Sequence, residues 1–170
     1  SAQALSPALS PDGKWLASGA EDNTARIWDF DGQTGKTIRI LAGHTDYIRC
    51  IVFSPDGKRL ATGSDDRTAK IWDLTTGQES TTLKGHGNFV QSIAFSFDGK
   101  RLATGSDDYT AKIWDSESGE ALLTLAGHTD KVLSVSFVPV TSVDPGSKQL
   151  LATASGDKTV KIWDLYSKDE

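Results

Sequence analysis

Three histidines, His44, His86 and His128, are spread along the chain, and each is followed by hydroxyl and aspartate residues. A histidine with a hydroxyl and a carboxylate is the residue set of a hydrolase triad, in which the histidine accepts a proton from the nucleophile. Here the set recurs along the chain, whereas one active site needs only one set. No G-x-S-x-G nucleophile turn is present either. The sequence therefore predicts no catalytic residues.

The same residues are not spaced for a metal ion. No H-E-x-x-H or C-x-x-C pattern occurs, and the pair Asp65-Asp66 does not match a calcium-binding loop. We therefore predict neither a metal site nor a cofactor. The only stretch that is not repeated, 138–148, contains Asp144 but no histidine or cysteine. An enzyme built on this scaffold is accordingly the weakest of the alternatives.

The elements that position these residues are repeated. The stretch GKRLATGSDDRTAKIWD (57–73) returns as GKRLATGSDDYTAKIWD (99–115) with a single change, and looser copies occupy 13–29 and 147–164. In the second copy we expect strands at 47–53, 59–64, 68–73 and 78–83, separated by the turns SPDG, DDR and TTG. The first of these strands is almost continuously apolar, which indicates burial on both faces. No stretch has sustained helical periodicity.

Four strands in each unit of about 42 residues, with a tryptophan-aspartate ending, resemble the WD-repeat β-propeller family. The resemblance covers nearly the whole chain. It implies an all-β fold of four propeller blades, each a four-stranded antiparallel sheet. The expected limits are about 1–41, 42–83, 84–125 and 126–170, and the last blade lacks its outer strand.

In this family a histidine, a serine or threonine, an aspartate and a tryptophan form a hydrogen-bonded set that fastens each blade. Imidazole, hydroxyl and indole N–H groups can all donate to a buried aspartate, which must be met by donors. The positions that match are Ser18, Asp22 and Trp28; His44, Thr62, Asp66 and Trp72; His86, Thr104, Asp108 and Trp114; and His128, Thr153, Asp157 and Trp163. The first repeat has no histidine.

The second and third repeats differ mainly after the Gly-His pair and at the turn position of Arg67 and Tyr109. In the family, the start of the innermost strand and the residue before the fastening aspartate form the partner-docking surface, here called the upper face. The resemblance places on it Glu21, Tyr47, Arg49, Asp65, Phe89, Gln91, Asp107, Lys131 and Leu133, together with Gln3, Leu5 and Gly156. Aromatic and arginine residues often anchor interfaces. Glu21, Asp65 and Asp107 would add negative charge and favour a partner segment with lysine or arginine.

Composition limits the alternatives. The chain is 37% hydrophobic and 24% charged, as in ordinary globular proteins, and its net charge of -5 does not favour general nucleic-acid binding. No apolar run has membrane-spanning length, and the N-terminus lacks the features of a secretory signal. We therefore expect an intracellular protein, cytoplasmic or nuclear, without a membrane partner.

Family rings usually have seven blades, whereas four repeats are present here. A four-blade arc would expose an apolar blade face at each end. A fragment of a larger ring or a half-ring that pairs with another copy is expected rather than a closed monomer. The predicted function is protein or peptide binding as a scaffold. A chromatin or nucleic-acid reader is the alternative, and it would need clustered basic residues on one face.

Overall fold

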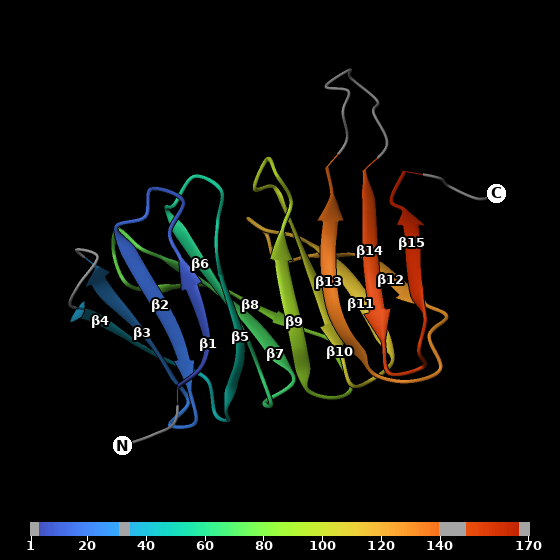
Figure 1. The fold of residues 1–170 in the computed structure, drawn as a ribbon, viewed down its shortest axis with the longest axis horizontal. Coiled ribbons are helices and arrows are strands. Elements are labelled where there is room, and N and C mark those ends of the chain that lie inside the picture. The colour runs from blue at the N-terminus through green and yellow to red at the C-terminus, as the bar shows by residue number, and fades with distance from the viewer. Residues whose placement is uncertain (1–3, 31–34, 140–148, 167–170) are drawn as a thin grey trace.

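The computed structural model describes residues 4–30, 35–139 and 149–166, which form fifteen β-strands and no helix. The strands make four antiparallel sheets in which neighbours in sequence are neighbours in space (Figure 1). Blade 1 contains β1 (Ala4–Leu9), β2 (Trp15–Ala20), β3 (Thr24–Phe30) and β4 (Gly35–Ala42). Blade 2 contains β5 (Ile48–Phe53), β6 (Arg59–Ser64), β7 (Thr68–Asp73) and β8 (Glu79–Lys84). Blade 3 contains β9 (Val90–Phe95), β10 (Arg101–Ser106), β11 (Thr110–Asp115) and β12 (Ala121–Ala126). Blade 4 has three strands, β13 (Val132–Val138), β14 (Leu150–Ser155) and β15 (Val160–Asp164).

The turns explain why the strands end where they do. In the SPDG turn, the N–H of Gly57 donates to the carbonyl of Ser54 at 2.9 Å, and Gly57 has a φ of 69°. Glycine accepts that left-handed conformation without a steric penalty. The turn between the second and third strands of each blade also places one residue in the left-handed region, namely Asn23, Arg67, Tyr109 or Lys158. The sequence difference between Arg67 and Tyr109 therefore lies at the tip of this turn.

The first and fourth strands predicted for blade 2 begin one residue later than expected. Tyr47 precedes β5, because its carbonyl accepts the N–H of Asp65 at 2.9 Å instead of joining the ladder. The outer strand β8 begins at Glu79 rather than Gln78, whose carbonyl accepts the N–H of Asp73 at the hairpin. The first strand of blade 2 is also less enclosed than expected, since Arg49 is exposed between buried neighbours.

The hydrophobic core lies between blades rather than within them. One face of each blade, here called the back face, carries small and branched side chains such as Ala25 and Ile27 of blade 1. The opposite face, the front face, carries larger ones such as Phe53, Leu60 and Trp72 of blade 2. The back face of blade 1 packs on the front face of blade 2, and the same arrangement joins blades 2 and 3 and blades 3 and 4. Each joint therefore buries two unlike faces.

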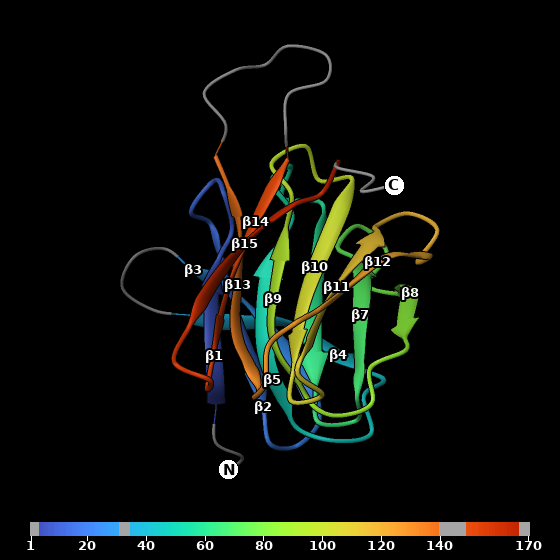
Figure 2. The same cartoon turned by 90° about the vertical axis from the view of Figure 1, so that its right-hand side faces the viewer.

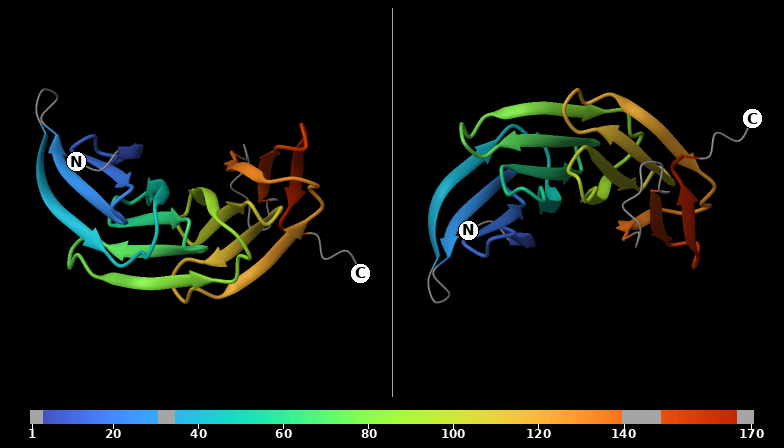
Figure 3. Two further views of the ribbon diagram at one scale, coloured as in Figure 1. Left: turned by 90° about the horizontal axis from the view of Figure 1, so that it is seen from below. Right: turned by 90° about the horizontal axis from the view of Figure 1, so that it is seen from above.

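The four blades follow a curve that is open on one side, with blades 1 and 4 at its ends (Figure 3). Figure 2 looks at the blade 4 end, where the β13–β14–β15 sheet has no sheet in front of it. Leu9 on blade 1 and Val160 and Ile162 on blade 4 are 54%, 67% and 59% exposed. The predicted all-β architecture of antiparallel propeller blades in an open arc is confirmed.

Candidate functional site

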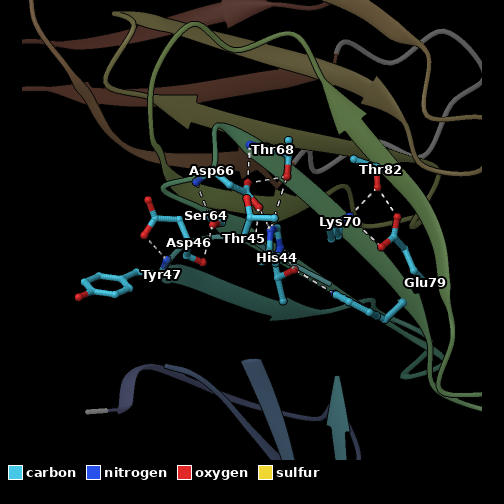
Figure 4. A network of polar contacts seen from close by, with 12 residues as sticks. His44, Thr45, Asp46, Tyr47, Ser64, Asp66, Thr68, Lys70, Glu79 and Thr82 are labelled. Atoms are coloured by element: carbon cyan, nitrogen blue, oxygen red, sulfur yellow. Dashed lines mark hydrogen bonds and ion pairs between the residues drawn. The ribbon is translucent and has the colours of Figure 1, made fainter. Parts of the chain in front are cut away.

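A line of polar side chains runs through the interior of blade 2. The indole Nε1–H of Trp72 donates to Thr62 Oγ1 at 2.9 Å, and Thr62 Oγ1 lies 2.8 Å from His44 Nε2. On the other side of the ring, His44 Nδ1 lies 2.7 Å from Asp66 Oδ2. Figure 4 shows His44 and Asp66 with the neighbours that surround the carboxylate. Strands β6 and β7 supply Thr62 and Trp72, whereas His44 precedes β5 and Asp66 lies in the β6–β7 turn.

The carboxylate of Asp66 determines the direction of each hydrogen bond between Trp72, Thr62, His44 and Asp66. A carboxylate only accepts, so Nδ1 of a neutral His44 carries the hydrogen and Nε2 accepts one from the Thr62 hydroxyl. The hydroxyl oxygen in turn accepts from the indole. Tryptophan, threonine, histidine and aspartate are thus arranged in series. The expectation that hydroxyl and indole would both donate directly to the aspartate differs from this geometry.

Asp66 instead receives hydrogen bonds from other nearby groups. The backbone N–H of Thr45 donates to Oδ2 at 3.1 Å, and the N–H and hydroxyl of Thr68 donate to Oδ1 at 2.9 and 2.6 Å. Burial by itself raises the pKa of Asp66, but the hydrogen bonds from His44 and Thr68 outweigh it and hold the pKa well below the usual range. The sequence comparison did not single out Thr45 or Thr68.

Blades 3 and 4 repeat the arrangement with almost identical geometry. The tryptophan–hydroxyl, hydroxyl–histidine and histidine–aspartate distances are 2.8, 2.7 and 2.7 Å in blade 3 and 2.8, 2.8 and 2.7 Å in blade 4. The residues are His86, Thr104, Asp108 and Trp114 in blade 3, and His128, Thr153, Asp157 and Trp163 in blade 4. In Asp108 burial opposes hydrogen bonds that lower the pKa, and in Asp157 the hydroxyl of Thr159 is the main cause of a lowered pKa.

Blade 1 has no histidine, and its aspartate has a different partner. Trp28 Nε1–H donates to Ser18 Oγ at 3.3 Å, but Asp22 is paired with the guanidinium of Arg26, whose Nη2 lies 2.5 Å from Oδ2. Hydrogen bonds from Arg26 and then Thr24 lower the pKa of Asp22 to about 2. Sequence reasoning missed Arg26. The available signal was its position, because the other three repeats have a lysine there, as in Lys70.

These polar lines cannot present a nucleophile to a substrate. The threonine residues that carry the hydroxyls are 0%, 0% and 1% exposed in blades 2, 3 and 4. Each hydroxyl is already engaged by both an indole and an imidazole. Across the described ranges, no group of three or more histidine, cysteine, aspartate or glutamate side chains is placed to hold a metal ion.

The upper face brings together some of the predicted residues as ion pairs. Arg49 donates from Nε and Nη2 to the two carboxylate oxygens of Asp65 at 2.5 and 2.7 Å. Its guanidinium carbon lies 5.7 Å from the centre of the Phe89 ring. Lys131 of blade 4 reaches across to Asp107 of blade 3 at 2.6 Å. The expected negative charge of the two aspartates is therefore balanced within the chain.

The two aspartates are not equally satisfied. Asp65 has both oxygens bound by Arg49. In blade 3 the residue in that position is Gln91, and Oδ1 of the buried Asp107 has no hydrogen-bond partner among the described residues. In blade 4 the position of Asp65 and Asp107 is occupied by Gly156, where a Cβ would lie 2.7 Å from a carboxylate oxygen of Asp130. The turn of blade 4 therefore has no counterpart of these two aspartates.

Other upper-face positions remain open to solvent. Tyr47 and Leu133 are 42% and 51% exposed, and Tyr109 in the neighbouring turn is 47% exposed. Phe89, Gln91 and Glu21 are half-buried. Gln3 lies outside the described residues, as do Asp144 and most of its loop. The Tyr109 ring was missed as a surface candidate although its difference from Arg67 was visible in the sequence.

The opposite end of the molecule has a cavity of about 570 Å³ between blades 2 and 3. Arg59 projects into this region and donates to the carbonyl of Gly99 at 2.7 Å and to Ser116 Oγ at 3.0 Å. Acidic side chains surround it, including Asp56, Asp98 and Glu117. Because these residues belong to the near-identical repeated block, the sequence comparison gave no reason to select them. Elsewhere, the described part of the chain contains no helix long and apolar enough to cross a membrane.

Comparison with known proteins identifies the repeats. A family model described as "WD domain, G-beta repeat" matches residues 3–29, 35–73, 77–115 and 119–164. The nuclear distribution protein PAC1 of Coprinopsis cinerea is 51% identical over 41 residues, which are 24% of this chain and 9% of PAC1. The general transcriptional corepressor TUP1 of Saccharomyces cerevisiae is 56% identical over 36 residues, which are 21% of this chain and 5% of TUP1. The protein lethal(2)denticleless of Drosophila melanogaster is 44% identical over 45 residues, 26% of this chain and 6% of that protein.

These matches cover less than a tenth of the length of each relative, so they compare repeats and not whole proteins. The family match, in contrast, extends over four consecutive repeats and most of the chain. The chain therefore belongs to the WD40 family, whose repeats form β-propeller blades.

Proposed function

We propose that this chain is a non-catalytic scaffold that binds a protein or peptide on its upper face. WD40 repeats generally serve as protein-interaction scaffolds. The observation that carries the proposal is the contrast between the frame and this face. Blades 2 and 3 are nearly identical in their polar lines and core, yet they differ at Tyr47 and Phe89, at Arg49 and Gln91, and in the turn. A rigid frame with variable loops is the usual design of a binding surface.

The chemistry of the face also favours this function. Tyr47 and Leu133 expose apolar surface, while the acids beside them are neutralised by Arg49 and Lys131. Internal neutralisation removes the reason to expect a strongly basic partner, and half-buried Glu21 is the remaining acid of the three. We propose a partner that supplies apolar or aromatic side chains to the exposed rings, with hydrogen bonds at the rim. We further propose an intracellular location, cytoplasmic or nuclear, and pairing of the open blade faces with further blades.

Selection of displayed peptides on the purified chain, followed by affinity measurement for the selected peptide, tests the upper face. We expect Tyr47→Ala and Phe89→Ala each to weaken binding by about tenfold or more, since aromatic side chains often dominate an interface. Tyr47→Ala is the cleaner of the two variants, because Phe89 also supports Arg49.

Phe97→Ala provides the matched control. Phe97 is an aromatic residue that is 61% exposed, but it lies in the turn after β9, at the opposite end of that strand from Phe89. Its replacement should leave the affinity unchanged. Equal losses in all three variants, or a loss only in Phe97→Ala, would show that the peptide docks elsewhere.

A further inference from the structure

The two open ends of the arc are unlike faces. Blade 1 presents a front face and blade 4 presents a back face, because every internal joint packs the back of one blade on the front of the next. The described parts of the two end faces are apolar at Leu9, Val160 and Ile162, all more than half exposed. The back of one copy can therefore meet the front of another in the way the internal joints do.

The back face of blade 4 is bulkier than its internal counterparts. In blades 1, 2 and 3, a glycine in the second strand pairs with an alanine in the third, as Gly63 pairs with Ala69. In blade 4 the same register position holds the pair Ala154 and Val160. The glycines matter inside the arc, since a Cβ on Gly63 would lie 2.7 Å from Val90 Cγ1 of the next blade. A standard blade front would therefore collide with the back of blade 4.

The front face of blade 1 is slimmer by a similar amount. Phe53, Phe95 and Phe137 each pair with a leucine across the two inner strands, whereas Leu9 occupies that register position in blade 1. The position next to the serine or threonine of each polar line holds Ile51, Ile93 and Val135 in blades 2 to 4, and Pro7 in blade 1.

The enlarged back and the reduced front compensate each other. If the back face of blade 4 met only water, replacing the glycine–alanine pair of the other blades by Ala154 and Val160 would be unfavourable, because it adds exposed apolar surface. We propose that the back face of blade 4 binds the front face of blade 1 of a second copy. This inference rests on the part of the proposed function in which open blade faces pair with further blades.

Two copies can satisfy both ends at once. Two head-to-tail joints related by a two-fold axis close a ring of eight blades, so that no end face remains open. Ring closure makes the second joint intramolecular, which strengthens the pair well beyond a single joint. The pairing leaves Tyr47 of the upper face free, because Tyr47 belongs to blade 2, whereas the end faces belong to blades 1 and 4.

Light scattering on the whole purified chain measures the assembly directly. We expect a mass of two chains, twice the 18.2 kDa of one. Leu9→Glu on the front of blade 1 and Ile162→Glu on the back of blade 4 should each reduce the mass to one chain, with the far-ultraviolet circular dichroism of the parent. Phe97→Glu is the control, since Phe97 is 61% exposed in the turn after β9 of blade 3, which is not an end blade, and this variant should stay paired.

Mixing the two disrupted variants tests the head-to-tail arrangement. Leu9→Glu keeps an intact back face and Ile162→Glu keeps an intact front face, so the mixture can form one joint although neither variant pairs alone. We expect a two-chain species only in the mixture, and with weaker affinity than the parent pair. A single-chain mass for the parent at concentrations on the order of 100 μM, where weak interfaces still associate, would overturn the proposal.

Other results would contradict it in different ways. Loss of pairing in only one of the two glutamate variants would indicate contact between like faces. A mass that grows beyond two chains with concentration would show an open filament instead of a closed ring. Neither result affects the upper face, because peptide affinity in the Tyr47 variant is measured separately from chain mass.

Discussion

At the scale of single residues, the aspartates of the polar lines differ in how much they depend on the protein for donors. Asp66 has a side chain 8% exposed and accepts from His44, Thr45 and Thr68. Asp22 is 35% exposed and paired with Arg26. Water can replace the lost partner at Asp22, whereas the His44 side chain is 0% exposed and depends on Asp66 as its acceptor. The same residue type therefore has two different energetic roles.

We expect Asp66→Ala to reduce the free energy of unfolding by about 3 kcal/mol, because the buried His44 and the partly buried Thr68 lose an acceptor that carried a charge. Asp22→Ala should cost only about 1 kcal/mol, since an exposed ion pair contributes little. Urea unfolding followed by tryptophan fluorescence measures both values. A cost for Asp66→Ala no larger than that for Asp22→Ala would mean that Asp66 is not the central acceptor of its blade.

Acid should weaken the same interactions. The folded pKa of Asp66, Asp108 and Asp157 lies below the ordinary value of 3.8, and that of Asp22 is about 2. The stabilisation is complete above the unfolded pKa and is lost as the pH falls from about 4 toward the folded values. The melting temperature should therefore drop steeply below about pH 4. The difference between the parent and Asp66→Ala should narrow over that range, and a constant difference would argue against this linkage.

At the scale of strands, most of the fold follows from local sequence. Alternation in TAKIWD, proline and glycine in SPDG, and the repeat itself were sufficient to place β6, β7, β10 and β11 at the residues expected. The resemblance to the WD-repeat family also gave the four residues of each polar line in blades 2 to 4. The Arg26–Asp22 pair could not be predicted, because nothing in the sequence shows which cation fills the space of an absent histidine. The neutralisation of Asp107 by Lys131 depends on the distance between neighbouring blades, which one repeat cannot reveal.

The second strands carry a constraint that comes from the next blade. Gly63 has no positive φ, so its role is spatial: an added Cβ would lie 2.5 Å from Cys50 Sγ and 2.7 Å from Val90 Cγ1. We expect Gly63→Ala to destabilise the chain by about 1–3 kcal/mol through overpacking at the joint of blades 2 and 3.

Gly87→Ala is the matched control for that prediction. Gly87 also lacks a positive φ, and its nearest neighbour to a new Cβ is Asp108 Cβ at 3.6 Å, an ordinary contact. Thermal unfolding should separate the two variants clearly, with Gly87→Ala within about 0.5 kcal/mol of the parent. Similar melting temperatures for both would mean that the joint can widen at little cost.

At the scale of the whole molecule, the arc is a row of joints that differ only in side-chain volume. The internal joints combine a slim back with a full front, and the proposed joint between two copies combines a full back with a slim front. Since cores tolerate exchange when the total volume is kept, the distribution of volume between the faces should matter less than its sum. This compensation between the two end faces can be tested by replacing side chains on each face with larger or smaller ones.

Pro7→Val makes the front of blade 1 resemble an internal front and should collide with Ala154 of the other copy. In the joint of blades 3 and 4, a Cβ on Gly105, at the position of Ala154, would lie 2.9 Å from Val135 Cγ1, at the position of Pro7. We expect it to weaken pairing about tenfold, from overpacking that costs on the order of 1–3 kcal/mol. Combining it with Ala154→Gly and Val160→Ala restores the internal combination and should recover most of the affinity, whereas the two blade 4 changes alone should leave a cavity and also weaken pairing. Analytical ultracentrifugation over a dilution series gives the three dissociation constants. Additive losses in the triple variant, in place of recovery, would mean that these positions do not face one another, because only side chains in contact compensate in this way.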